Sequence, residues 1–133
     1  MKRILLAYDG GEPAKRALET AAELAKKFEA LVSVVSVVPV HAGRIGMDVW
    51  EDPDVHAREL REARSLLALQ GIEAEVIEPI GEPALAIERI ARDGAFDTIV
   101  VGSRGLGAIS RLLQGSVSGH VATHADATVV VVR

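Results

Sequence analysis

Three glycines and two serines near the end of the chain have the spacing expected of an anion-binding site. Gly102, Gly105 and Gly115 follow the pattern G-x2-G-x9-G, and Ser116 and Ser118 come after it. Glycine permits positive φ angles and lets a ligand approach the main chain closely. Successive main-chain N–H groups in such a turn form a concave site for an anion. The spacing therefore predicts a phosphate-binding loop.

The second half of this pattern opens a short helix, which we predict over residues 116–124. The first N–H groups of a helix have no intrahelical partner and lie at the positive end of its dipole, where phosphate binds readily. A plain surface loop in which Ser116 only caps the helix is the simpler alternative. A loop this long in a small domain is usually functional or disordered. Four aliphatic side chains argue against disorder: Leu106, Ile109, Leu112 and Leu113.

The composition indicates one aliphatic domain over residues 1–133. Hydrophobic residues make up 49% of the chain and aromatic residues only 3%, so we expect an aliphatic core. The absence of cysteine excludes disulfides and thiolate metal sites. A net charge of −4 without a basic block argues against nucleic-acid binding. The first apolar run breaks at Asp9, too early for a signal peptide or a membrane span, so we expect a cytoplasmic protein.

Short apolar runs alternate with helical patterns along the chain. We predict strands at residues 3–8, 31–38, 72–78, 97–101 and 128–132, and helices at residues 12–28, 54–70, 83–93 and 116–124. Phe28 and Leu85 fall on the apolar helix faces, with Val55 as a further candidate. Irregular residues 40–53 predict a surface loop. The alternation predicts an α/β fold, a three-layer sandwich around a five-stranded parallel sheet, and right-handed connections favour the strand order 3-2-1-4-5.

This strand order creates a binding crevice between the first and fourth strands. Ligands of open α/β sheets bind where the strand order reverses, beyond the carboxyl ends of the strands. Residues 9–11 (Asp-Gly-Gly) and residues 102–105 (Gly-Ser-Arg-Gly) follow those two ends. Anion chemistry and topology therefore indicate the same crevice.

Over its whole length the chain resembles the universal stress protein (UspA-like) family. Residues 102–118 reproduce the family's ATP-binding pattern G-x2-G-x9-G-[ST], and residues 4–10 and 129–133 look like its first and last strands. The resemblance implies a Rossmann-like, adenine nucleotide alpha hydrolase-like fold. It also implies a nucleotide-dependent regulator of the stress response, with ATP (or ADP or AMP) and Mg²⁺ (or Mn²⁺) as cofactors.

The resemblance implies roles for particular residues. Asp9 would lie near the ribose and the metal–phosphate end of ATP, touching the metal only indirectly as part of Mg-ATP. Ala7 and Tyr8 would line the pocket, and Val37 would contact adenine through its backbone. The remaining binding residues would hold the ribose and phosphates: Val101, Gly102, Ser103, Arg104, Gly105, Gly115, Ser116, Val117 and Ser118.

Some of these residues have simpler roles open to them. Asp9 could form an Asx turn or cap the following helix, and a carboxylate beside phosphates would need a divalent cation. Arg104 and Arg111 could neutralise phosphates or remain solvated surface charges. Family members often carry serine where this chain has Gly11, so one hydroxyl donor is missing.

Catalytic signatures are missing from the sequence. It contains no P-loop G-x-x-x-x-G-K-[ST], no G-x-G-x-x-G after the first strand, and no apparent Ser-His-Asp set. His120 and His124 share helical spacing but lack a third metal ligand nearby. We therefore expect at most slow hydrolysis. The alternatives are a nucleotide-free dimeric interaction module and a slow nucleotide hydrolase with His41 or Asp48 as its base.

The last strand predicts a homodimer. In the order 3-2-1-4-5 the third and fifth strands are edges, and the third is protected by glutamates at 73, 75 and 78. Residues Val129–Val132 carry no charge, and such an edge invites pairing with another chain. A two-fold dimer through the last strand would cover it, unless a loop does so.

Overall fold

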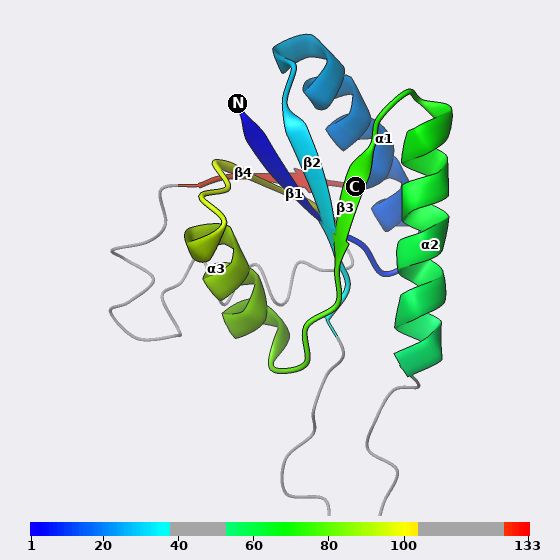
Figure 1. Ribbon diagram of the computed structural model, residues 1–133, viewed down its shortest axis with the longest axis vertical. Coiled ribbons are helices and arrows are strands. Elements are labelled where there is room, and N and C mark those ends of the chain that lie inside the picture. The colour runs from blue at the N-terminus through cyan, green and yellow to red at the C-terminus, as the bar shows by residue number, and fades with distance from the viewer. Residues whose placement is uncertain (38–52, 104–126) are drawn as a thin grey trace, which may run out of the picture.

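Strands and helices alternate along the chain in the computed structural model (Figure 1), which describes residues 1–37, 53–103 and 127–133. The elements are β1 (Arg3–Ala7), α1 (Glu12–Phe28), β2 (Leu31–Val35), α2 (Pro53–Leu69), β3 (Ala74–Ile77), α3 (Pro83–Asp93), β4 (Thr98–Gly102) and β5 (Thr128–Val132). The predicted helix at 116–124 and nearly all of the predicted loop at 40–53 lie outside these described residues.

The five strands form one parallel sheet in the order β3-β2-β1-β4-β5, which confirms the predicted topology. The register aligns Ala7 of β1 with Val35 of β2 on one side and with Val101 of β4 on the other. The carboxyl ends of these three strands therefore meet at the same end of the sheet. Figure 1 shows α1 and α2 on one face and α3 on the other.

Alternate residues of the strands fill two separate cores. Ile4, Leu6 and Val34 pack with the apolar faces of α1 and α2, and all three are completely buried. Leu5 and Val35 point to the opposite face, where they pack against α3. Strands covered on both faces need continuous apolar runs, which explains the sequence of β1 and β4.

Local sequence signals explain where the helices begin and end. Pro13 stands in the first turn of α1, where its missing N–H costs nothing. The carboxylate of Glu82 caps α3 by accepting a 2.8 Å hydrogen bond from the N–H of Leu85. Gly71 follows α2 with a φ of +79°, the left-handed conformation that glycine adopts without strain, and confirms the predicted helix end.

The buried faces of the helices contain fewer residues than the periodicity predicted. Phe28, Val55 and Leu85 were expected inside, but they are 49%, 38% and 44% exposed. Phe28 is the last residue of α1, and Leu85 lies in the first turn of α3, where Ala84 takes the buried position. An apolar side chain is buried only where another element covers it, and these positions lie at helix ends. No helix in the described ranges is long and apolar enough to cross a bilayer.

Candidate functional site

The carboxyl ends of β1 and β4 lie side by side at the point where the strand order reverses. Ala7 pairs with Val101 across the two strands, and the N–H of Tyr8 donates to the carbonyl of Val35 at 3.0 Å. This end of the sheet brings together the predicted site residues that the structure describes: Ala7, Tyr8, Asp9, Val37, Val101, Gly102 and Ser103. The other predicted residues lie outside the described part of the chain: Arg104, Gly105, Gly115, Ser116, Val117 and Ser118.

A tight turn links β1 to α1 at this edge. One carboxylate oxygen of Asp9 accepts a 2.9 Å hydrogen bond from the N–H of Gly11, and Gly10 adopts a φ of +80°. The Asx turn considered from the sequence is therefore present. Gly11 is the N-cap of α1 and offers no side-chain cap. Apart from the bond that Asp9 makes to Gly11, no side chain in the described ranges caps the amino end of α1.

Gly102 has a packing role that the glycine pattern did not predict. A Cβ atom at this position would lie 2.6 Å from the carbonyl carbon of Pro13 and 2.7 Å from the nitrogen of Ala14. Both contacts are with backbone, which cannot move aside as a flexible side chain can. Glycine therefore lets the end of β4 touch the first turn of α1. This contact holds the positive end of the helix against the carboxyl end of β4.

Tyr8 directs its side chain away from the sheet edge and toward α2. It is 3% exposed, packs in the core beneath α1 and α2, and donates a hydrogen bond to a carboxylate oxygen of Glu62. Burial raises the pKa of the phenol, and the hydrogen bond to Glu62 and the charges of Glu62, Glu59 and Asp9 raise it further. Any contribution of Tyr8 to the crevice therefore falls to its main chain.

A buried polar cluster behind the turn was missed by sequence reasoning. Ser36 Oγ and His56 Nδ1 share a 2.7 Å hydrogen bond, and both residues are almost fully buried. Glu59 Oε2 lies 3.4 Å from Ser36 Oγ and 3.9 Å from His56 Nδ1. The side chain of Glu59 also reaches Gly10, because a Cβ there would lie 3.4 Å from its Cγ. The available signal was a histidine and a glutamate three residues apart on a predicted helix.

This cluster does not have the geometry of a hydrolytic triad. In such a triad the serine and the carboxylate contact different nitrogens of the histidine ring. Here Ser36 and Glu59 both approach Nδ1 of His56. The arrangement instead anchors the first turns of α2 to the end of β2 and supports the turn after β1.

The carboxylates around the turn determine which metal chemistry the site suits. Among the described residues, no group of three His, Cys, Asp or Glu side chains could hold a metal ion. Mg²⁺ commonly uses only one or two protein carboxylates and takes its other ligands from phosphates and water. Asp9 has a carboxylate oxygen beyond the one bonded to Gly11. The carboxylate of Asp9 therefore fits a cation that arrives with a phosphate ligand.

Comparison with protein families gives a match over the whole chain. The family described as "Universal stress protein family" matches residues 1–133. A "universal stress protein in QAH/OAS sulfhydrylase 3'region" from Thermus aquaticus is 37% identical over 140 residues, covering 99% of this chain and 98% of that protein. Universal stress protein YxiE from Bacillus subtilis is 31% identical over 148 residues, covering 98% of each.

A solved structure shares both the fold and the chain length. The universal stress protein from Archaeoglobus fulgidus, solved in complex with dAMP, superposes with a TM-score of 0.70 at 28% identity. The likeness covers all of this chain and 98% of that one.

Proposed function

The chain belongs to the universal stress protein family, and we propose that it binds ATP at the carboxyl ends of β1 and β4 and acts as a nucleotide-dependent switch in a stress response. The observation that carries the proposal is the meeting of residues 9–11 with residues 102–103 where the strand order reverses. Gly102 allows the first turn of α1 to reach the same place. Both elements offer main-chain N–H groups to phosphate oxygens.

An adenine nucleotide is the ligand class that the relatives support. The Archaeoglobus fulgidus relative was solved with dAMP, an adenine monophosphate. The triphosphate is proposed because residues 102–118 match the ATP-binding pattern G-x2-G-x9-G-[ST] of the family. In this proposal Ala7, Val37 and Val101 lie beside the adenine and ribose, and Gly105, Gly115, Ser116, Val117 and Ser118 follow the phosphates with Ser103 and Arg104.

The proposed metal is a Mg²⁺ or Mn²⁺ ion that arrives with the nucleotide. Asp9 supplies the carboxylate charge next to the phosphates, and without a cation it would repel them. The ion would neutralise phosphate charge when bound. We therefore expect ATP to bind more weakly when the metal is removed with EDTA. The Asp9→Asn variant should lose most of this metal dependence, and an unchanged affinity in EDTA would exclude the metal role of Asp9.

We propose binding and at most slow hydrolysis. Efficient nucleotide hydrolysis needs a group that orients the attacking water. The only serine–histidine pair seen in the described residues is the buried pair of Ser36 and His56, which anchors α2. A turnover of several per second by purified protein would contradict this part of the proposal.

The proposed assembly is a cytoplasmic homodimer that pairs the last strands of two chains. Within the described residues β5 pairs only with β4, and Val131 is 38% exposed. Edge-to-edge pairing would satisfy its outer main-chain groups and cover Val129–Val132. Light scattering at micromolar concentration should give the mass of a dimer, and a monomer mass would contradict the pairing.

The decisive experiment identifies the ligand directly. Purified protein is extracted with acid to release any bound nucleotide, and the emptied protein is titrated calorimetrically with Mg·ATP, Mg·ADP and AMP. The Gly115→Val variant should lose binding because the added side chain obstructs the approach of phosphate. Ala68→Val adds comparable bulk on the exposed surface of α2 and should bind normally. If the unmodified protein gives no heat of binding with any of these nucleotides, the alternative of a nucleotide-free interaction module is favoured.

A further inference from the structure

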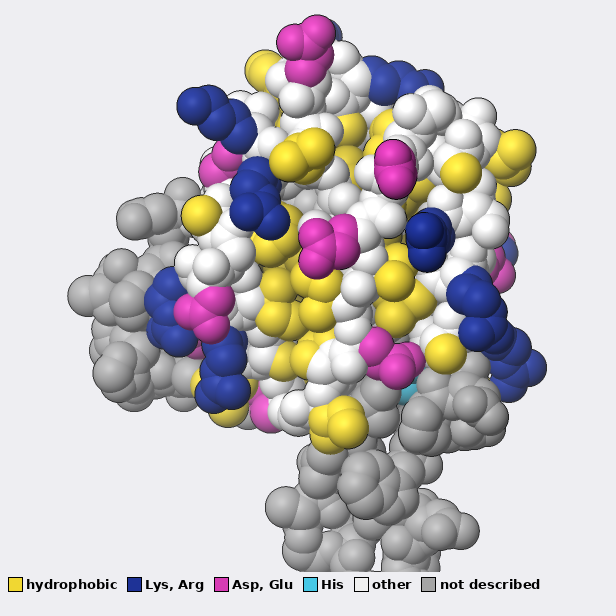
Figure 2. All heavy atoms as spheres, in the orientation of Figure 1, with side chains coloured by type: hydrophobic (Ala, Val, Ile, Leu, Met, Phe, Trp, Pro, Cys, Tyr) yellow, Lys and Arg dark blue, Asp and Glu magenta, His cyan; other side chains and the backbone are white. Residues whose placement is uncertain are grey.

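A groove runs between α2 and the outer edge of β3, and none of its lining residues belongs to the proposed nucleotide site. Two adjoining hollows of about 350 and 270 Å³ form it, and Arg64 lines both. Ala57, Leu60 and Val76 give the second hollow an apolar floor. Figure 2 shows a row of arginine side chains over α2, with hydrophobic side chains between them and β3.

The wall formed by β3 is an open strand edge. β3 is the last strand on its side of the sheet as described. The carbonyl of Ile77 accepts from the N–H of Ser36, the residue that follows β2. Neighbouring residues of a strand direct their main-chain groups to opposite sides, so the N–H and C=O of Val76 face away from β2. No described strand lies on that side of β3, and such an edge can accept a further strand.

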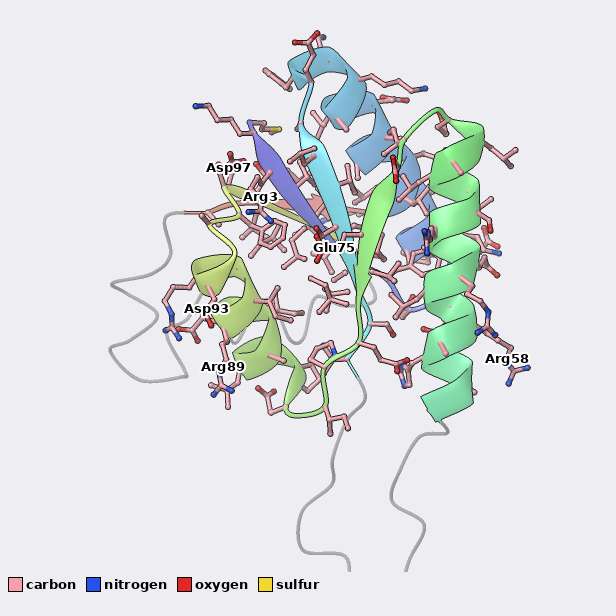
Figure 3. The ribbon with its side chains drawn as sticks, in the orientation of Figure 1. Arg3, Arg58, Glu75, Arg89, Asp93 and Asp97 are labelled. Carbon is pink, nitrogen blue, oxygen red and sulfur yellow. The ribbon has the colours of Figure 1, made fainter. Side chains whose placement is uncertain are left out.

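The wall formed by α2 carries two arginines whose charge is not paired with a carboxylate among the described residues. Arg61 and Arg64 are both exposed. Neither guanidinium group forms a hydrogen bond or an ion pair with any residue in the described ranges. Glu75 projects from the other face of β3, away from α2, as Figure 3 shows. A strand added to this edge would therefore meet Arg61, Arg64 and Glu78 on its α2 side, a net positive charge, and Glu75 on its other side.

We propose that this groove binds an extended segment of another protein, which adds to the sheet beside β3. Its side chains alternate, with acidic and aliphatic residues toward Arg61 and Arg64 and a basic residue toward Glu75. β3 has four residues, so a segment of about the same length pairs along its whole outer edge. Main-chain pairing supplies affinity and the alternating side chains supply specificity, as in other strand-addition complexes.

A second copy of the chain does not fit this edge. Pairing β3 with β3 across a two-fold axis would bring the glutamates at 73, 75 and 78 of one chain toward those of the other. Like charges placed opposite each other across paired strands are destabilising. The glutamates therefore select against self-association and in favour of a partner with the complementary charge pattern.

The test uses two synthetic ten-residue peptides of identical composition. In the first, glutamate and valine alternate with lysine and threonine, so that one face is acidic and the other basic. In the second, the two glutamates are adjacent and the two lysines are adjacent, so no register gives a uniform face. We expect the first peptide to bind at least about tenfold more tightly by fluorescence anisotropy. Its glutamates can all face Arg61 and Arg64 while its lysines face Glu75, whereas the second peptide always places some charges opposite like charges.

Protein variants locate the binding. Arg61→Glu combined with Arg64→Glu should weaken the first peptide by about tenfold or more. Arg89→Glu, an equal charge reversal per site on the exposed face of α3, should change it less than twofold. Val76→Pro removes one outward N–H, a change that edge strands tolerate, and should abolish binding. Nucleotide binding should be unchanged in all of these variants, so this test is independent of the proposed function.

Three results would overturn the proposal. One is equal binding of the two peptides, or no binding of the first at millimolar concentration. Another is a double arginine variant that binds as well as the unmodified protein. The third is a set of NMR amide shift changes on β5 that leaves Val76 unaffected. If Val76→Pro fails to fold, the arginine variants and the amide shifts still decide the question.

Discussion

Replacing Gly102 with alanine tests the contact that holds α1 against β4. The new methyl group would lie 2.6 to 2.8 Å from three main-chain atoms of Pro13 and Ala14, well inside van der Waals contact. Relief requires the first turn of α1 to move away from the sheet. Overpacking of this kind costs about 2 kcal/mol. A chain of this length has an unfolding entropy of about 280 cal/mol/K near its midpoint, so we expect the melting temperature to fall by about 7 °C.

Gly71→Ala is the matched control, because that glycine is required for a different reason. A Cβ at Gly71 would meet no atom within 4 Å, but the backbone φ there is +79°. The cost is then only that of a left-handed alanine, about 1 kcal/mol, or about 4 °C by the same conversion. Gly71 precedes β3 and so lies at the amino ends of the strands, away from the proposed crevice.

The two variants should therefore separate stability from binding. Thermal unfolding followed by circular dichroism gives the melting temperatures, and calorimetric titration with Mg·ATP gives the affinities. Gly102→Ala should lower both, because the first turn of α1 is displaced from the crevice. Gly71→Ala should lower only the melting temperature. If the melting temperature of Gly102→Ala is within about 1 to 2 °C of that of the unmodified protein, then α1 and β4 are not in contact and α1 does not contribute to the proposed site.

Three further predictions concern polar contacts within the described residues. Tyr8→Phe removes the hydrogen bond to Glu62 and should cost about 1 kcal/mol in urea unfolding. Because folding raises the pKa of Tyr8, the unmodified protein should also lose stability as the pH rises above about 10, and the variant should lose less. Burial of Asp97 opposes its ionisation, but hydrogen bonds from the N–H groups of Lys2 and Arg3 and the hydroxyl of Thr98 outweigh burial and lower its pKa. The stability from Asp97 is therefore present above about pH 4 and lost below it, and Asp97→Asn should flatten the acid limb of a pH series of melting temperatures. Ser36→Ala leaves Nδ1 of His56 without its hydroxyl partner and should cost about 1 to 2 kcal/mol, measured by urea unfolding, whereas no loss would show that the cluster does not anchor α2.

Most of the secondary structure could be predicted because its signals are local. Continuous apolar runs, the alternation at residues 72–78 and the helical patterns of apolar residues are all local to the chain, and they located all five strands and the three described helices. Gly71 ends α2 and Glu82 caps α3, each within one turn of its helix, so these helix boundaries could also be predicted. The strand order followed from chain alternation and handedness, and it brought residues 9–11 and 102–103 to one edge.

The tertiary structure decided how each side chain is used. The local sequence does not distinguish a glycine that leaves room for a ligand from one that lets a helix pack closely. Only the structure shows that Gly102 packs against the main chain of Pro13. The contact between Ser36 and His56 joins residues twenty positions apart, and no periodicity encodes such a pair. Phe28 has the right spacing to be buried but no neighbour to cover it. Local pattern fixes which face a residue occupies, whereas its contacts depend on which distant element lies opposite.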